Sequence, residues 1–125
     1  MVRELTVEHR RALYTEACAV IATHNGKDIS LDEVARHIAT SRRQLQRAFL
    51  EVGGVTFRER LLHERCEHAA RLIAAGVPVA QVAAELGYAR QSHFARAFRR
   101  HHGVTPTEFA LRAHADRAHA PERPR

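Results

Sequence analysis

The sequence predicts an all-α fold of seven helices, in which a long linker helix joins two helix-turn-helix subdomains. Three observations lead to this prediction. Hydrophobic residues make up 45% of the 125 residues and aromatic residues only 6%, so the core consists mainly of Ala, Leu, Val and Ile, and Ala and Leu favour helices. Apolar residues recur at helical spacing, and no stretch holds the two-residue alternation of a half-buried strand. The third observation is an internal repeat.

Capping residues mark where the helices begin. Thr6 is expected to cap a first helix over 7–24, which Asn25-Gly26 ends. Four later positions have the capping-box pattern, in which a Ser or Thr is followed three residues on by Glu or Gln. They are Ser30–Glu33, Ser41–Gln44, Thr56–Glu59 and Thr105–Glu108.

Glycines and prolines set the remaining boundaries. The third helix is expected over 42–52, where Gly53-Gly54 stops it. Pro78 is expected at the first position of a helix that Gly87 closes, and the next helix runs over 90–101. The predicted divisions are an N-terminal helix with the first helix-turn-helix subdomain (1–56), the linker helix (57–75), the second helix-turn-helix subdomain with a short last helix (76–112) and a flexible tail (113–125).

The internal repeat relates the two halves of the chain. Val34-Ala35 recurs 48 residues later as Val82-Ala83. Arg47-Ala48-Phe49 recurs 49 residues later as Arg96-Ala97-Phe98, so the second copy has one extra residue near its turn. Each copy consists of a helix, a tight turn, a second helix, a glycine and a capped helix. A repeated unit of this kind indicates a repeated physical task.

The charge of the chain points to a polyanionic partner. The net charge is +6 and the pI is about 10.6, and Lys27 is the single lysine among the 20 basic residues. The planar fork of arginine binds a phosphate or the edge of a guanine bidentately. A basic protein from an arginine-rich proteome would have a similar composition, so composition alone leaves both interpretations open.

In each repeat the second helix has a polar face opposite its apolar one. With Phe49 turned inward, the opposite face of the first copy contains Arg43, Gln46, Arg47 and Leu50, and Arg42 joins the first three in a dense set of possible base readers. With Phe98 turned inward, the opposite face of the second copy contains Gln91, Ser92, His93, Arg96, Arg99 and Arg100. A surface helix selected only for solubility usually mixes both signs of charge, but the first acidic residue on either helix is Glu51. Such a face suits a recognition helix, which lies in the major groove of DNA.

These residues resemble the DNA-binding domain of the AraC/XylS transcription regulators, over residues 29–110. The matching motifs are VAQVAAELGY at 79–88, SHFARAF at 92–98 and GVTP at 103–106, together with LDEVA at 31–35 and LQRAF at 45–49. The resemblance implies a two-lobed fold of seven helices. It also implies that both recognition helices enter successive segments of the major groove on one face of double-stranded DNA.

The resemblance further implies which residues touch DNA. Base contacts fall on Arg43, Gln46, Arg47, Gln91, Ser92, His93 and Arg96. Backbone contacts fall on Arg42, Thr56, Arg90, Arg99, Arg100 and Thr105, although the two threonine caps also have a purely structural interpretation. Some relatives carry an aromatic residue at the position of Arg43, so a target sequence does not transfer from one member to another.

No catalytic, cofactor or metal site is predicted. His63 and His68 stand five residues apart and do not share a helix face, and Cys18 and Cys66 lie on inward stripes as core thiols. The sequence contains no acid pair, phosphate-binding loop or nucleophile–base motif, so we expect that the protein is not an enzyme.

The expected function is that of a bacterial, cytoplasmic, nucleoid-associated transcription regulator that binds a specific DNA sequence, as a monomer and without a cofactor or a membrane. One alternative is an interaction module that contacts RNA polymerase or another regulator and binds DNA weakly. A second is a non-specific nucleic-acid-binding protein. About 28 residues precede the first helix-turn-helix, which is too few for an effector domain, so we expect either a stand-alone regulator or a fragment of a longer one.

Overall fold

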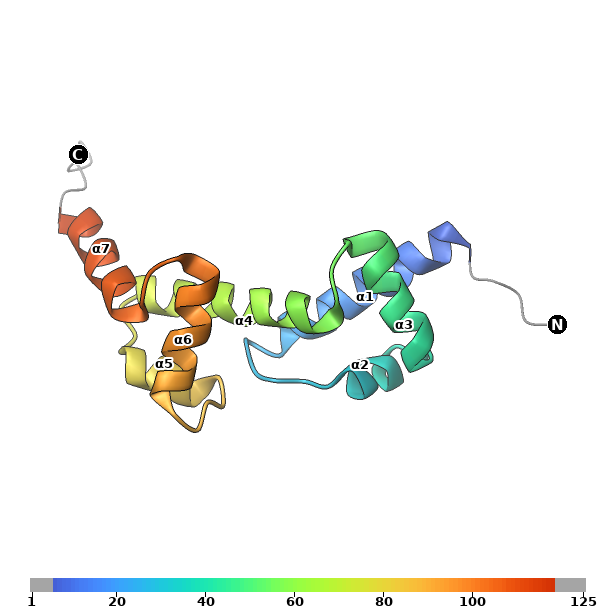
Figure 1. The fold of residues 1–125 in the computed structure, drawn as a ribbon, viewed down its shortest axis with the longest axis horizontal. Coiled ribbons are helices and arrows are strands. Elements are labelled where there is room, and N and C mark those ends of the chain that lie inside the picture. The colour runs from blue at the N-terminus through green and yellow to red at the C-terminus, as the bar shows by residue number, and fades with distance from the viewer. Residues whose placement is uncertain (1–5, 119–125) are drawn as a thin grey trace, which may run out of the picture. The chain divides into compact units, whose positions relative to one another are not determined.

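The computed structural model describes residues 6–118, and the helices along this range confirm the predicted all-α fold (Figure 1). Strands are absent from the described range. The elements are α1 (Val7–Thr23), α2 (Leu31–His37), α3 (Arg42–Ala48), a π-helical turn η1 (Phe49–Gly53), α4 (Phe57–Ala74), α5 (Val79–Glu85), α6 (Gln91–His102) and α7 (Pro106–Ala118). No helix in residues 6–118 is both long and apolar enough to cross a bilayer.

The chain forms two compact units, and the boundary between them lies inside α4. The first unit ends at Arg65 and the second begins at Cys66. The linker helix expected over 57–75 corresponds to α4, and each half of α4 contributes to the core of one unit. Leu61 belongs to the core of the first unit, whereas Ala69 and Ile73 belong to that of the second.

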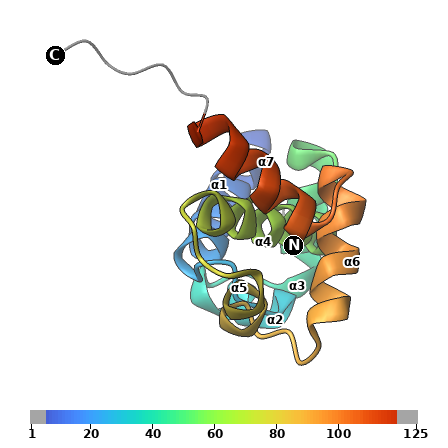
Figure 2. The ribbon, with the colours of Figure 1, turned by 90° about the vertical axis from the view of Figure 1, so that its left-hand side faces the viewer.

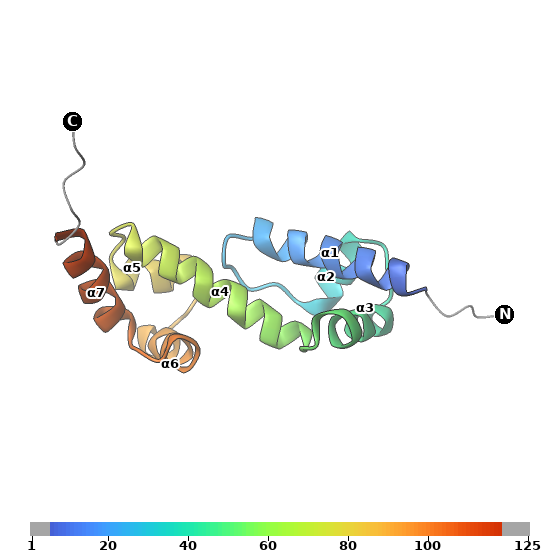
Figure 3. The same ribbon diagram turned by 90° about the horizontal axis from the view of Figure 1, so that it is seen from above.

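In the first unit, α1 packs against α2 and α3 (Figure 3). Val34, Leu45 and Phe49 are fully buried in the core between these helices. The expected caps form, because the hydroxyl oxygen of Thr6 accepts a hydrogen bond from the His9 N–H at 3.1 Å and Ser30 makes the complete capping box with Glu33. Capped starts and an apolar inner face together explain why these short segments are helical.

The end of the first recognition helix differs from the prediction. An α-helix was expected as far as residue 52, but Phe49–Gly53 is a π-helical turn. Here the ring of Phe49 makes edge contacts with Tyr14 and Phe57, at centroid distances of 5.2 Å and 5.5 Å. A Cβ atom on Gly53 would lie 2.6 Å from Cε2 of Tyr14, so glycine is needed here for close approach. Apolar spacing cannot distinguish a π turn from an α turn over five residues.

In the second unit, α5, α6 and α7 surround the C-terminal half of α4 (Figure 2). The side chains of Val82, Phe94 and Phe98 are buried there, each with at most 1% of its surface exposed. Phe98 also contacts Phe109 of α7, at a centroid distance of 5.5 Å. These contacts hold α6 so that one face is inside the core and the other is in solvent.

The two turns confirm the predicted repeat. α2 and α5 are each seven residues long, and α6 begins 49 residues after α3. The turns have the same backbone pattern, because Ala39 and Gly87 both have positive φ, at 56° and 85°. The next residue in each turn, Thr40 or Tyr88, donates its N–H to the carbonyl five residues earlier. The extra residue of the second copy therefore lies between this common turn and α6.

Three local predictions are corrected. α7 continues to Ala118, so residues 113–118, expected in a flexible tail, are helical; the rest of that tail (119–125) lies outside the described residues. Pro78 is the N-cap of α5 rather than its first residue. Ser41 caps α3 through the Gln44 N–H, but the side chain of Gln44 accepts a hydrogen bond from Thr40 and does not complete a capping box.

Candidate nucleic-acid interface

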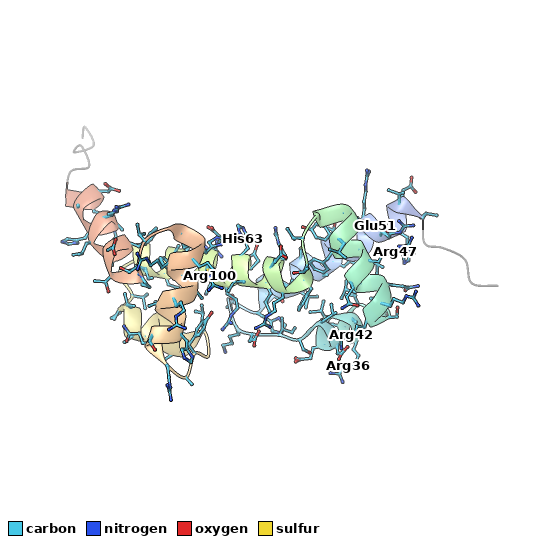
Figure 4. All side chains as sticks on the ribbon, in the orientation of Figure 1. Arg36, Arg42, Arg47, Glu51, His63 and Arg100 are labelled. Atoms are coloured by element: carbon cyan, nitrogen blue, oxygen red, sulfur yellow. The ribbon has the colours of Figure 1, made fainter. Side chains whose placement is uncertain are left out.

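The outer face of α3 is polar and basic, as expected. Arg42 and Arg43 lie in its first turn, which has no acidic residue, and Gln46 and Arg47 follow one turn later. All four side chains are exposed, while Leu45 and Ala48 on the opposite face are buried. Arg42 lies 3.4 Å from a carboxylate oxygen of Asp32 on α2, and both side chains are about 60% exposed, so water competes with this contact. Figure 4 shows Arg42 at the start of α3 and Arg47 further along it.

A groove with a volume of about 680 Å³ runs beside this face within the first unit. Its lining includes Arg42 and Gln46 of α3, and Thr56 and Arg58 at the start of α4. The hydroxyl oxygen of Thr56 accepts the Glu59 N–H at 3.1 Å and caps α4. The groove therefore brings a predicted base contact and two predicted backbone contacts to one surface.

The outer face of α6 carries the corresponding residues of the second unit. The predicted base contacts on this helix are all exposed, and they are Gln91, Ser92, His93 and Arg96. His93, Arg96 and Arg100 line one shallow hollow, and Arg96, Arg99, Arg100 and Thr105 line a second. Residues 91–102 include no acidic side chain, so this face is uniformly polar or positive.

Two predicted backbone contacts stand at helix starts. Arg90 is the N-cap residue of α6 and is exposed. Thr105 is half-buried, and its hydroxyl accepts the Glu108 N–H while donating to the Glu108 carboxylate, each at 3.1 Å. Because this hydroxyl already has both roles filled, Thr105 has a structural task whether or not α7 begins near a phosphate.

Glu51 is a residue of this surface that the sequence interpretation missed. One of its carboxylate oxygens accepts a hydrogen bond from Nε of Arg47 at 2.7 Å, and the other accepts one from Arg10 of α1. These hydrogen bonds, first that of Arg47, lower the pKa of the Glu51 carboxyl below its ordinary value. The four-residue spacing of Arg47 and Glu51 is a readable signal for this ion pair. Arg10 lies 41 residues from Glu51 in sequence, so only the folded structure shows this contact.

The last two residues of α6, His101 and His102, make structural contacts. His102 lies with Nε2 3.1 Å from the carbonyl oxygen of Cys66 and its ring 4.3 Å from that of Phe98. His101 pairs with Glu67 at 3.1 Å. Cys66 is buried, with 2% of its surface exposed, as predicted for a core thiol. These contacts fix the end of α6 on α4 within the second unit.

Comparisons with known proteins agree with this geometry. Residues 34–112 match a family model described as a helix-turn-helix domain. The HTH-type transcriptional regulator RipA of Corynebacterium glutamicum is 39% identical over 90 residues, which cover 72% of this chain and 27% of RipA. The chain spans about a quarter to a third of the length of the first curated relatives it matches.

Solved structures have the same fold. A transcriptional regulator of Chromobacterium violaceum with an AraC-type DNA-binding domain has a TM-score of 0.78 and 26% identity, covering 91% of this chain and 99% of the other. The DNA-binding domain of AdpA, solved in complex with a target DNA, has a TM-score of 0.75 over 86% of this chain and 97% of the other. At 24% identity, the second likeness concerns the fold alone.

Proposed function

Since this chain belongs to the AraC-type helix-turn-helix family of DNA-binding transcription regulators, we propose that it recognises a specific duplex sequence by placing α3 and α6 in the major groove. One recognition helix per unit would then read its own segment of the groove.

The observation that carries the proposal is the division of each recognition helix into a buried aromatic face and an exposed reading face. Phe49 anchors α3 and Phe98 anchors α6, and neither side chain has any exposed surface. A rigidly held helix keeps its outward side chains at defined positions, which base reading requires. Non-specific binding needs positive charge but no such mixture of residue types.

We assign base reading to the outward residues near the start of each helix. Arginine pairs bidentately with guanine, and glutamine pairs with adenine. The proposed readers are Arg43, Gln46 and Arg47 on α3, and Gln91, Ser92, His93 and Arg96 on α6. The first set has more arginine and the second is more mixed, so the site read is expected to be asymmetric.

Phosphate contacts are assigned to the flanks of these faces. The arginines proposed for this role are Arg42, Arg90, Arg99 and Arg100, all of which are exposed. The helix starts at Thr56 and Thr105 present backbone N–H groups, and a helix N-terminus attracts a phosphate. The Thr105 hydroxyl both accepts from and donates to Glu108, so a phosphate contact there falls on main-chain N–H groups, whereas the Thr56 hydroxyl, which accepts the Glu59 N–H, can still donate its O–H to a phosphate.

Selection of bound duplexes from a random pool tests the proposal. An enriched sequence is expected, and Arg47→Ala and Arg96→Ala should each weaken binding to it by about 1–3 kcal/mol. Arg71→Ala is the matched control, because Arg71 is an exposed arginine on α4 outside both assigned sets. Absence of any enriched sequence, or equal losses on the enriched and scrambled duplexes for both variants, would contradict the proposal.

A further inference from the structure

We propose that Glu51 is a positioning residue for base recognition: it holds the guanidinium of Arg47, and Arg10 on α1 holds Glu51 in turn. The inference rests on the proposed function, in which Arg47 reads a base. It gives a role in recognition to Arg10, which lies outside the matched helix-turn-helix domain because that match begins at residue 34.

The three side chains form a short relay at the surface of the first unit, in which exposure rises from Arg10 to Arg47. The Arg10 side chain is 15% exposed, that of Glu51 is 38% exposed and that of Arg47 is 51% exposed. Arg10 belongs to α1, Glu51 to η1 and Arg47 to α3, so three elements meet at one carboxylate. Figure 4 shows Arg47 and Glu51 close together at the end of α3.

Each oxygen of the Glu51 carboxylate has its own arginine. Oε1 accepts from Nε of Arg47 and Oε2 accepts from a terminal nitrogen of Arg10. A carboxylate held from two sides cannot rotate freely, and a guanidinium held at Nε has its plane defined. The two cations also favour the ionised form of Glu51, since their hydrogen bonds lower its pKa.

A defined guanidinium plane is useful for reading guanine. Arginine has five N–H donors; the Glu51 contact uses one, and a bidentate guanine contact uses two, so both contacts can be made together. A free arginine side chain loses rotamer freedom when it is ordered on DNA, and ordering it beforehand reduces that loss. Glu51 is the one acidic residue in 42–53, and its charge works against DNA affinity in general. Its expected benefit is therefore discrimination between bases rather than affinity.

The relay is testable without disrupting the fold, because exposed ion pairs contribute little to stability. The base pair concerned is the one whose preference is lost in Arg47→Ala. In Glu51→Gln, preference at that base pair should fall by about 3- to 10-fold, part of what a full bidentate contact supplies. Binding to a scrambled duplex should stay equal or strengthen, since a negative charge is removed. Arg10→Ala should change preference at the same base pair in the same direction.

Glu16→Gln is the matched control, because it removes the same charge from an exposed position on α1. We expect it to change binding to all duplexes equally. In an Arg47→Ala background, Glu51→Gln should leave the relative affinities for the four duplexes unchanged, because its effect acts through Arg47. Titrating wild type and these variants against four duplexes that differ at this base pair gives every comparison.

Three results would overturn the inference. Glu51→Gln could change the affinity for all four duplexes by the same factor, as is expected of Glu16→Gln, and this would indicate a general charge effect alone. It could strengthen binding with full discrimination, which would make Glu51 a competitor of DNA. It could also change the relative affinities for the four duplexes in the Arg47→Ala background, where Arg47 is no longer present to transmit the effect. A wild-type chain with no base preference at any position would instead refute the proposed function itself.

Discussion

Arg96 and Arg100 provide a matched pair for separating base reading from phosphate binding. Both are exposed arginines on α6, one helical turn apart, and they line the same shallow hollow with His93. We assign Arg96 to a base and Arg100 to a phosphate. Replacing each with Ala removes the same charge from the same helix, so a purely electrostatic interface would respond equally to both changes.

The expected magnitudes follow from counterion release. Each neutralised phosphate contributes about −0.9 to the slope of log K against log salt concentration. If only the four assigned backbone arginines neutralise phosphates, the wild-type slope is about −3.6, and if all seven assigned arginines do so, it is about −6.3. Arg100→Ala should make the slope shallower by about 0.9 and weaken binding to every duplex alike.

Arg96→Ala should behave differently. We expect the slope to stay near its wild-type value, while about 1–3 kcal/mol is lost on the selected duplex and little on one substituted at the contacted base pair. Fluorescence anisotropy with labelled duplexes over about 50–300 mM salt measures both quantities. Equal slope changes in the two variants, with no base-dependent loss for Arg96→Ala, would refute the division into reader and phosphate contact.

Further predictions concern the fold and its ionisable groups. Gly53→Ala places a Cβ 2.6 Å from the Tyr14 ring and should destabilise the chain by about 1–3 kcal/mol in urea unfolding, and Tyr14→Leu in the same chain should recover part of this loss. If the stability losses of Gly53→Ala and Tyr14→Leu simply add in the double variant, the contact between these residues is not the cause. Gly87→Ala should cost about 1–2 kcal/mol, because φ is 85° and a Cβ there would meet no atom within 4 Å, so the cost would come from backbone strain alone; unchanged stability would contradict this. Because the hydrogen bond from Arg47 lowers the folded-state pKa of Glu51, its stabilising effect is complete above about pH 4.3 and is lost as the pH falls through the folded-state pKa. Because the pair is exposed, the difference is small: wild type should lose slightly more stability in acid than Glu51→Gln, and a larger acid loss in Glu51→Gln would contradict the direction of the pKa shift.

Periodicity and capping predicted most of the fold because both act within a few residues. Thr6 and Ser30 cap the helices that the sequence assigns to them, and the repeat locates both turns. Gln44 shows the limit of such rules, because Thr40 competes for its side chain. The composition of α7 beyond residue 112 is polar, yet the helix continues to Ala118, since a capped helix with Phe109 docked in the core can extend past its last buried residue.

The candidate interface was predictable where it depends on one helix face and not where it depends on tertiary contacts. Helical spacing predicts that Arg47 and Arg96 lie on the outer faces of their helices, and both are exposed. The contact of Arg10 with Glu51 joins residues 41 apart in sequence, and no local pattern indicates it. The same holds for the packing of Tyr14 against Gly53. Local sequence indicates only that Gly53 ends a helix, and the folded structure shows that it also leaves room for the Tyr14 ring.

The ratio of dissociation constants for the selected duplex and its scrambled version tests the central claim most directly. The claim is that α3 and α6, each held by a buried apolar face, read a specific DNA sequence with their exposed faces. At physiological salt we expect the selected duplex to bind at least about 10³-fold more tightly, as is typical of specific DNA-binding proteins. A ratio near one would mean that the exposed faces of α3 and α6 supply charge alone, and it would contradict the claim.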